Sequence, residues 1–253
     1  MAPQETLDEN DSDQRREIFV GCAELPPGMS RTVYFQKLRF LETRLPGDEL
    51  PGERVLRRWR ADAGGAGRFA IVAPRELCDL SGSLEARRAD RVALADRLGR
   101  AAAELGAAAV VFPTAPEVTP STAHRDRLRW LFEEVAPAER MGGALRVWQP
   151  DGLWRPAVAH RVAGELGVVA VQDPLAEDVL DEGPLPEPGP IAYVRVLGLG
   201  RSGRPLGEDD LARIAEWLEP CRRALVAFGT TARLRDATAL ARWVGGAAPA
   251  GWN

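Results

Sequence analysis

Several residue types are scarce in this chain of 253 residues, and their scarcity excludes several kinds of site. The only histidines are His124 and His160, so a histidine-rich metal site is excluded. The three cysteines lie far apart and fit neither a zinc motif nor a disulfide framework. We therefore expect a protein of a reducing compartment that holds no metal and no other cofactor.

An excess of basic charge and long apolar runs are also lacking. The 33 basic residues are outnumbered by 37 acidic ones, so a nucleic-acid-binding surface is not expected. No run of about 18 apolar residues is present, so no membrane span is predicted. Residues 1–16 are polar and acidic, which is typical of a disordered tail and not of a signal peptide. These features predict a cytoplasmic protein and leave its oligomeric state open.

Short apolar runs alternate with helical patterns after this tail. Several runs show no polar alternation, which is typical of strands that are covered on both faces. The eight predicted strands are residues 18–22, 38–43, 68–73, 107–113, 142–147, 167–172, 191–197 and 224–229. The predicted helices are residues 53–63, 83–105, 121–135, 155–166, 207–222 and 232–244. Prolines interrupt the connections after the first and sixth strands, so short or missing helices are expected there.

Alternation of strands and helices through the whole chain predicts a parallel sheet. Eight repeats in a chain of this length predict a single closed (βα)8 barrel of the TIM type, in the α/β class. This barrel would occupy residues 17–244, followed by a second tail over residues 245–253. A doubly wound open sheet is the alternative, but it needs a glycine-rich phosphate turn after the first strand. Residues 22–26 do not form such a turn.

Motifs spread over residues 18–244 resemble the YecE-like family, a domain-of-unknown-function family with a TIM-type barrel. In the first half they are Leu41-Glu42-Thr43-Arg44, Leu50-Pro51, residues 55–59 and residues 68–75. In the second half they are Leu145-Arg146, Gln172-Asp173-Pro174, residues 192–195 with Gly198, and Ala227-Phe228. The resemblance implies the barrel fold, and the family has no established activity that could be transferred.

The chain departs from the family pattern at several polar or ionisable positions. A family lysine in the third strand is Val72, a glutamate before the fifth-strand arginine is Ala144, and a histidine after the seventh strand is Leu197. The residues after the second-strand glutamate and the end of the eighth strand, residues 44–48 and 229–231, also differ. Apolar side chains cannot act as acids, bases or electrostatic clamps. The resemblance therefore implies a catalytically degenerate barrel that binds a ligand or a partner protein.

Charged residues at the strand ends are the candidate site, because a TIM barrel carries its site on the C-terminal face of the strands. The candidate catalytic residues are Glu42 and Asp173. The candidate ligand-binding residues are Arg44, Arg146, Trp148 and Arg195. We expect the two carboxylates and the three arginines to cluster within one barrel mouth.

Two interpretations of this cluster stay open. In one, Arg146 and Arg195 hold a small anionic or hydroxyl-rich ligand, with the carboxylates as acceptors or acid–base groups. In the other, the charges pair with one another and close the barrel end as a structural network. Two functions follow: a non-catalytic protein that binds a small anionic ligand or a partner protein, or an enzyme acting on a small anionic or polyhydroxylated substrate.

Overall fold

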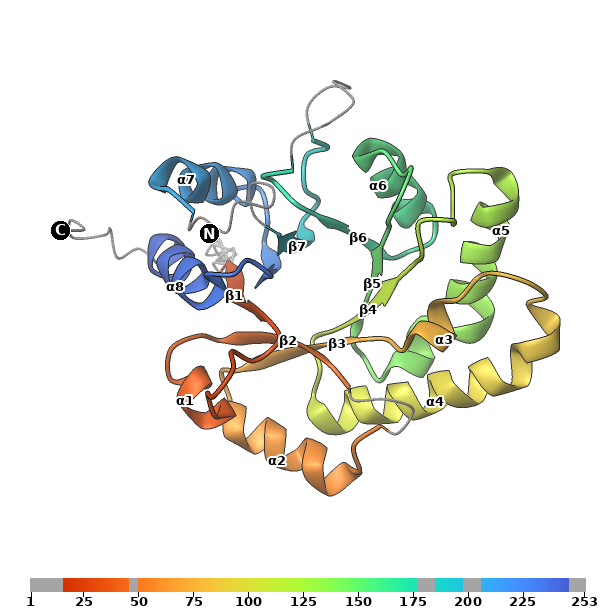
Figure 1. The fold of residues 1–253 in the computed structure, drawn as a ribbon, viewed down its shortest axis with the longest axis horizontal. Coiled ribbons are helices and arrows are strands. Elements are labelled where there is room, and N and C mark those ends of the chain that lie inside the picture. The colour runs from red at the N-terminus through yellow and green to blue at the C-terminus, as the bar shows by residue number, and fades with distance from the viewer. Residues whose placement is uncertain (1–15, 46–49, 177–184, 198–205, 246–253) are drawn as a thin grey trace, which may run out of the picture.

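The computed structural model describes residues 16–45, 50–176, 185–197 and 206–245. Within these residues, eight parallel strands close into a barrel in chain order, and β8 pairs with β1. The strands are β1 (Glu17–Ala23), β2 (Phe40–Arg44), β3 (Arg68–Val72), β4 (Ala109–Pro113), β5 (Leu145–Gln149), β6 (Val169–Gln172), β7 (Ile191–Val196) and β8 (Arg223–Phe228). Helices lie around the outside of these strands (Figure 1). The predicted single (βα)8 barrel is confirmed.

The helices vary in length from one turn to five. They are α1 (Arg31–Phe35), α2 (Glu53–Ala63), α3 (Arg75–Cys78), α4 (Arg88–Leu105), α5 (Thr122–Trp130), α6 (Pro156–Glu165), α7 (Glu208–Trp217) and α8 (Arg233–Val244). The connection after β1 carries only the five-residue α1, as the prolines predicted. After β6, residues 173–176 and 185–190 contain no helix, and residues 177–184 lie outside the described part of the chain.

Two helix ends show how local sequence sets these boundaries. Ser121 caps α5, because its side-chain oxygen accepts a hydrogen bond from the backbone N–H of His124 at 3.4 Å. Gly106 ends α4 in the left-handed conformation, with φ of 64°, and its N–H donates to the last-turn carbonyl groups of Ala102 and Ala103. The chain can therefore turn directly from α4 into β4.

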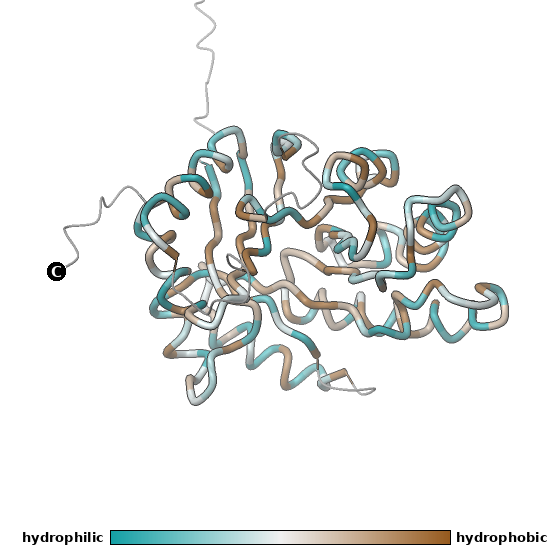
Figure 2. Tube along the Cα trace, turned by 45° about the horizontal axis from the view of Figure 1, so that its top comes forward, coloured by the Kyte–Doolittle hydropathy of each residue, from teal (hydrophilic) through white to brown (hydrophobic). Residues whose placement is uncertain are grey.

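Each strand packs on both of its faces. Side chains such as Phe40, Val147 and Leu225 form an apolar cluster inside the barrel. Side chains in the next positions along the strands, such as Leu41 and Val226, join a second cluster between the barrel and the helices. Figure 2 shows hydrophobic colour along the strands and mixed colour on the helices around them. This double coverage explains why the strands lack polar alternation.

The fifth strand differs from the prediction by several residues. It was expected over residues 142–147, and it runs from Leu145 to Gln149. Gly142 and Gly143 have φ values of 61° and 81°, a left-handed conformation that a strand does not use. The strand therefore starts later and includes Gln149, which becomes part of the site.

The predicted tails, residues 1–16 and 245–253, lie almost entirely outside the described residues and stay predictions. No helix in the described part of the chain is long and apolar enough to cross a bilayer.

Candidate functional site

A buried ion pair lies inside the barrel towards the C-terminal ends of the strands. Glu42 on β2 is 1% exposed, and its Oε1 accepts a hydrogen bond from Nη2 of Arg195 on β7. Its Oε2 accepts a hydrogen bond from the hydroxyl of Tyr193, also on β7, at 2.6 Å. Arg195 donates through Nη1 to Oε1 of Gln149 on β5. Two side chains of β7 therefore occupy both oxygens of the Glu42 carboxylate, and Gln149 extends this network to a third strand.

Strand geometry explains this arrangement. Tyr193 and Arg195 are two residues apart, so both side chains point to the inside of the barrel. A buried charge is costly unless it is paired, and the carboxylate and the guanidinium pair with each other, although Nε of Arg195 is buried without a hydrogen-bond partner. Burial, and secondly the charge of Glu42, raises the pKa of Tyr193 well above its ordinary value. The phenol therefore remains a hydrogen-bond donor at neutral pH.

A second ion pair joins the end of β2 to the residue after β1 and is open to solvent. Arg44 ends β2 two residues after Glu42, so the two side chains share the inner face of the strand. Nε of Arg44 lies 3.7 Å from Oε1 of Glu24, and the side chains are 50% and 58% exposed. The N–H of Glu24 donates to the carbonyl oxygen of Glu42 at 2.8 Å, which continues the pairing of β1 with β2.

The backbone of Glu24 is in an unusual conformation. Its φ is 72°, and among the described residues no other residue except glycine has a positive φ. A side chain in this left-handed region crowds its own backbone, at a cost of about 1–2 kcal/mol. Such outliers cluster at functional sites, where the surrounding structure maintains them.

Asp173 lies just after β6 and joins two loops of the C-terminal face. Its Oδ1 accepts a hydrogen bond from the N–H of Leu175, and its Oδ2 accepts one from the N–H of Leu197, each at 3.0 Å. Burial raises the pKa of Asp173, against the effect of the two hydrogen bonds and of Arg213. No hydrogen bond or ion pair between described residues connects Asp173 to Glu42 or Arg195.

Arg146 does not lie with the other charged residues, so the expectation of one cluster is wrong for this residue. Its Nη1 donates to the carbonyl oxygens of Phe132 and Ala136 at 2.7 and 3.3 Å. Its Nη2 donates to the carbonyl oxygen of Gly167 at 3.0 Å. Side chains alternate along β5, and Val147 occupies the inner face, so Arg146 points outward to the helix layer.

Trp148, predicted as a ligand-binding residue, lies on the same outer face of β5 and away from the barrel mouth. Its ring is 0% exposed and packs edge-to-face against Trp154, with ring centroids 4.7 Å apart. Its Nε1 donates to the hydroxyl oxygen of Thr114 at 3.0 Å. The ring is therefore part of the packing under the loop after β5, out of reach of a ligand at the barrel mouth.

Two members of the inner network, Gln149 and Tyr193, were not among the predicted site residues. A signal for both is present in the sequence. Tyr193 precedes Arg195 by two residues, and Gln149 follows Val147 by two, so each pair shares one face of its strand. Because the fifth strand was expected to end at Val147, Gln149 was left outside it.

The positions that depart from the family pattern lie in different surroundings. Val72 is 3% exposed and belongs to the apolar cluster inside the barrel. Ala144 is buried in the layer between the barrel and the helices. Leu197 is 60% exposed at the end of β7. None of the three brings an ionisable side chain to the network around Glu42.

Neither metal binding nor thiol chemistry finds support in the described residues. They contain no group of three or more His, Cys, Asp and Glu side chains that could hold a metal ion. Cys22 is buried at the end of β1, and burial raises its pKa to about 11. A thiol with this pKa is protonated at neutral pH, and the thiolate is the nucleophilic form.

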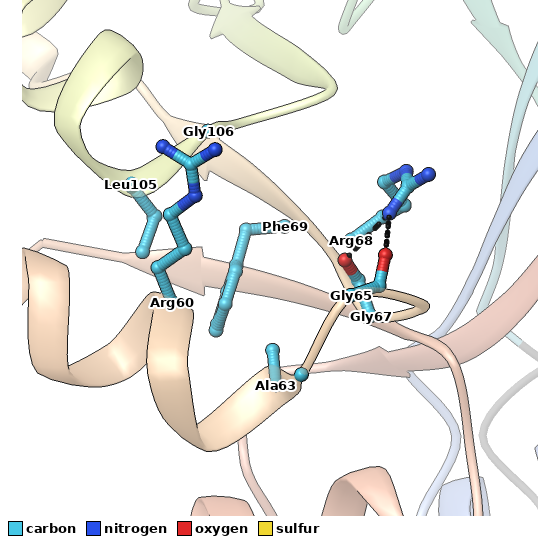
Figure 3. A pocket seen from close by; sticks show the side chains of 9 residues that line it. Arg60, Ala63, Gly65, Gly67, Arg68, Phe69, Leu105 and Gly106 are labelled. Atoms are coloured by element: carbon cyan, nitrogen blue, oxygen red, sulfur yellow. Dashed lines mark hydrogen bonds between the residues drawn. The ribbon is translucent and has the colours of Figure 1, made fainter.

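A cavity of about 330 Å³ lies at the other end of the barrel, where β3 begins (Figure 3). Its lining includes Arg60 from α2, the first two residues of β3, and Gly106 after α4. Arg68 already bonds the backbone, because its Nη1 donates to the carbonyl oxygens of Gly65 and Gly67 at 2.9 and 3.0 Å. The C-termini of α2 and α4 offset the charge of Arg60, since each is worth about half a negative charge. The helix termini therefore balance Arg60, whereas the charge of Arg68 remains and is held by two backbone carbonyl oxygens.

Comparison with known proteins gives the fold. No family model matches the chain, and no curated protein matches it. A DUF72 family protein from Enterococcus faecalis is similar in structure, with a TM-score of 0.65 and 12% identity over 91% of this chain and 98% of that one. A DUF72 family protein from Thermotoga maritima has a TM-score of 0.62 and 11% identity, over 90% and 99% of the two chains.

Barrels with other functions are similar as well. A family 2 AP endonuclease from Brucella melitensis has a TM-score of 0.59 and 11% identity, over 91% of this chain and 99% of that one. An L-ribulose 3-epimerase has a TM-score of 0.57 and 15% identity, over 91% and 92% of the two chains. At such low identity the similarity shows the fold alone. The chain is a TIM barrel whose structural neighbours include DUF72 family proteins.

Proposed function

We propose that this chain is a divergent YecE-like barrel that binds a small ligand or a partner protein through the C-terminal face of its strands, without catalysing a reaction. Two observations support the assignment to a YecE-like barrel: the sequence motifs in both halves of the chain, and the structural similarity to DUF72 family proteins. The occupation of both Glu42 carboxylate oxygens by Arg195 and Tyr193 is the observation that carries the non-catalytic reading.

A general base or nucleophile needs a lone pair that faces the substrate. Glu42 presents none to a substrate from solvent, because the residue is 1% exposed and each carboxylate oxygen already accepts a hydrogen bond, from an arginine or a phenol. Freeing the carboxylate would leave Arg195 buried without a counter-ion. General acid–base catalysis typically supplies about 10²–10⁴-fold in rate. A barrel that has lost its acid and base can therefore still bind a ligand, although it converts that ligand slowly or not at all.

Asp173 favours a second candidate, an enzyme acting on a small anionic or polyhydroxylated substrate. Burial raises the pKa of this carboxyl group, as in many general acids. Its two oxygens, however, accept hydrogen bonds from the backbone of Leu175 and Leu197, which gives Asp173 a structural role already. The enzyme is therefore the weaker of the two proposals.

One experiment measures binding and turnover on the same purified chain. Ligand-observed NMR with a library of sugars, sugar phosphates and small carboxylic acids identifies binders, and each binder is then followed over hours for conversion. We expect saturable binding that weakens in Arg44→Gln, with no product. Arg54→Gln is the control, because Arg54 is exposed on the outer helix α2. Turnover that disappears in Asp173→Asn or Glu42→Gln would establish the enzyme instead.

A further inference from the structure

Each arginine of the barrel mouth has a carboxylate beside it. Arg195 bonds Glu42 and Gln149, and Nε of the half-exposed Arg44 lies 3.7 Å from Oε1 of Glu24. The carboxylates of Glu24 and Glu42 offset these two guanidinium groups, and the charge of Arg213 acts on Asp173. An anionic ligand would therefore find no excess of positive charge in this set.

Glu24 is the member of the set that a ligand can displace. Its pair with Arg44 is half-exposed, whereas the pair of Glu42 with Arg195 is buried. The backbone bond from Glu24 to Glu42 places the Glu24 side chain beside Arg44, although glycine would adopt its φ of 72° without strain. A strained residue that supplies a charge at a barrel mouth suggests a role in binding.

We propose that Glu24 is a specificity-determining residue. Its carboxylate lies beside Arg44 and makes the barrel mouth select a neutral, hydroxyl-bearing ligand over an anionic one. This inference rests on the proposed binding function and names its ligand class. The carboxylate of Glu24 repels an anion that approaches the half-exposed Arg44. Hydroxyl groups both donate and accept hydrogen bonds, so a polyol can contact Glu24 and Arg44 without separating them.

The test compares two probes that share a six-carbon polyhydroxylated chain, neutral sorbitol and anionic gluconate. Their dissociation constants are measured by NMR titration at low ionic strength with the wild-type chain and with Glu24→Gln. We expect the wild type to bind sorbitol more tightly. Glu24→Gln should tighten gluconate binding about fivefold, the upper range for one exposed ion pair, and change sorbitol binding less than twofold.

Two further variants make the comparison specific. Glu24→Gly removes the carboxylate and the strained side chain together, so it should shift gluconate binding as Glu24→Gln does even if glutamine disturbs the loop. Glu53→Gln is the matched control, because Glu53 forms an exposed pair with Arg57 on the outer helix α2, at 2.6 Å. It should change the binding of neither probe.

Each possible result decides the inference. Tighter binding of gluconate than of sorbitol by the wild type, or an unchanged ratio of the two constants in both Glu24 variants, would overturn the role of Glu24. Either result leaves the proposed binding function standing, because a probe has bound. If no variant binds either probe, the ligand class is wrong, and the library screen decides the binding function separately.

Discussion

Two glutamate–arginine pairs lie towards the C-terminal ends of the strands, one inside the barrel and one at its mouth, and they differ in burial. The side chains of Glu42 and Arg195 are 1% and 10% exposed, whereas those of Glu24 and Arg44 are 58% and 50% exposed. Removing one partner of a buried pair leaves an uncompensated charge in a medium of low polarity. At an exposed pair, water and salt replace the lost partner. The same chemistry can therefore hold the barrel together at one level and select ligands at the next.

The largest expected effect comes from breaking the inner pair. Glu42→Gln should lower the free energy of unfolding by about 3–5 kcal/mol, because Arg195 then remains buried without its counter-ion. Urea denaturation measures the change, with Glu24→Gln as the control at the outer pair, where about 1 kcal/mol or less is expected. A similar small loss in both variants would show that the two pairs do not differ as their burial indicates.

Tyr193→Phe tests the second donor to Glu42. A hydrogen bond to a charged group is worth about 1.5–3 kcal/mol, so the variant should lose stability by that amount. In a Glu42→Gln background the same substitution should cost less, because the charge is gone. Urea denaturation of the four proteins gives the coupling energy. Equal costs in the two backgrounds would mean that the phenol and the carboxylate act independently.

Asp173 adds a third carboxylate to the comparison. It accepts hydrogen bonds from backbone N–H groups, whereas the carboxylates of Glu42 and Glu24 are paired with arginines. Burial raises the pKa of Asp173, so the folded state retains the proton at a pH where the unfolded state has lost it. Protonated Asp173 therefore favours the folded state at low pH, and this contribution disappears as pH rises through the raised pKa.

The measurement is the free energy of unfolding of wild type minus that of Asp173→Asn, followed from about pH 3.5 to pH 7. This difference should fall as pH rises, with a slope of at most about 1.4 kcal/mol per pH unit for one carboxyl group. A difference that stays constant or rises over this range would contradict the raised pKa.

The smallest expected effect is at Glu24, and it separates backbone strain from charge. Glu24→Gly and Glu24→Ala both remove the pair with Arg44, but only glycine relieves the left-handed conformation. Glycine should therefore be the more stable variant by about 0.5–1 kcal/mol, after its greater freedom in the unfolded state is subtracted. Thermal denaturation measures the difference. An alanine variant as stable as the glycine variant would show that the position is not strained.

The fold was predictable because its signals are local. Apolar runs without alternation indicate strands covered on both faces, and the helix signals at Ser121 and Gly106 lie within a few residues of the ends that they set. The candidate site was predictable only in part. Glu42, Arg44, Asp173 and Arg195 do lie at the C-terminal end of the barrel, whereas Arg146 and Trp148 point into the helix layer.

This difference has a physical cause in the alternation of strand side chains. Local pattern shows that Arg146 and Trp148 share one face of β5 and that Val147 and Gln149 share the other. Which face points inward depends on how β5 pairs with β4 and β6, because a shift by one residue exchanges the two faces. The left-handed glycines before Leu145, whose φ values only the structure shows, set the start of the strand.

By itself the amino-acid sequence determined the order of strands and helices and the closed barrel that this order favours, because periodicity and helix caps act over a few residues. Only the tertiary structure decided that Glu42 is bonded by Arg195, 153 residues later in the chain. That contact needs every intervening strand in its place, since both side chains point to the barrel axis from strands that are not neighbours. Pairing and burial of the charged groups are properties of the closed barrel, and no local segment of the chain encodes them.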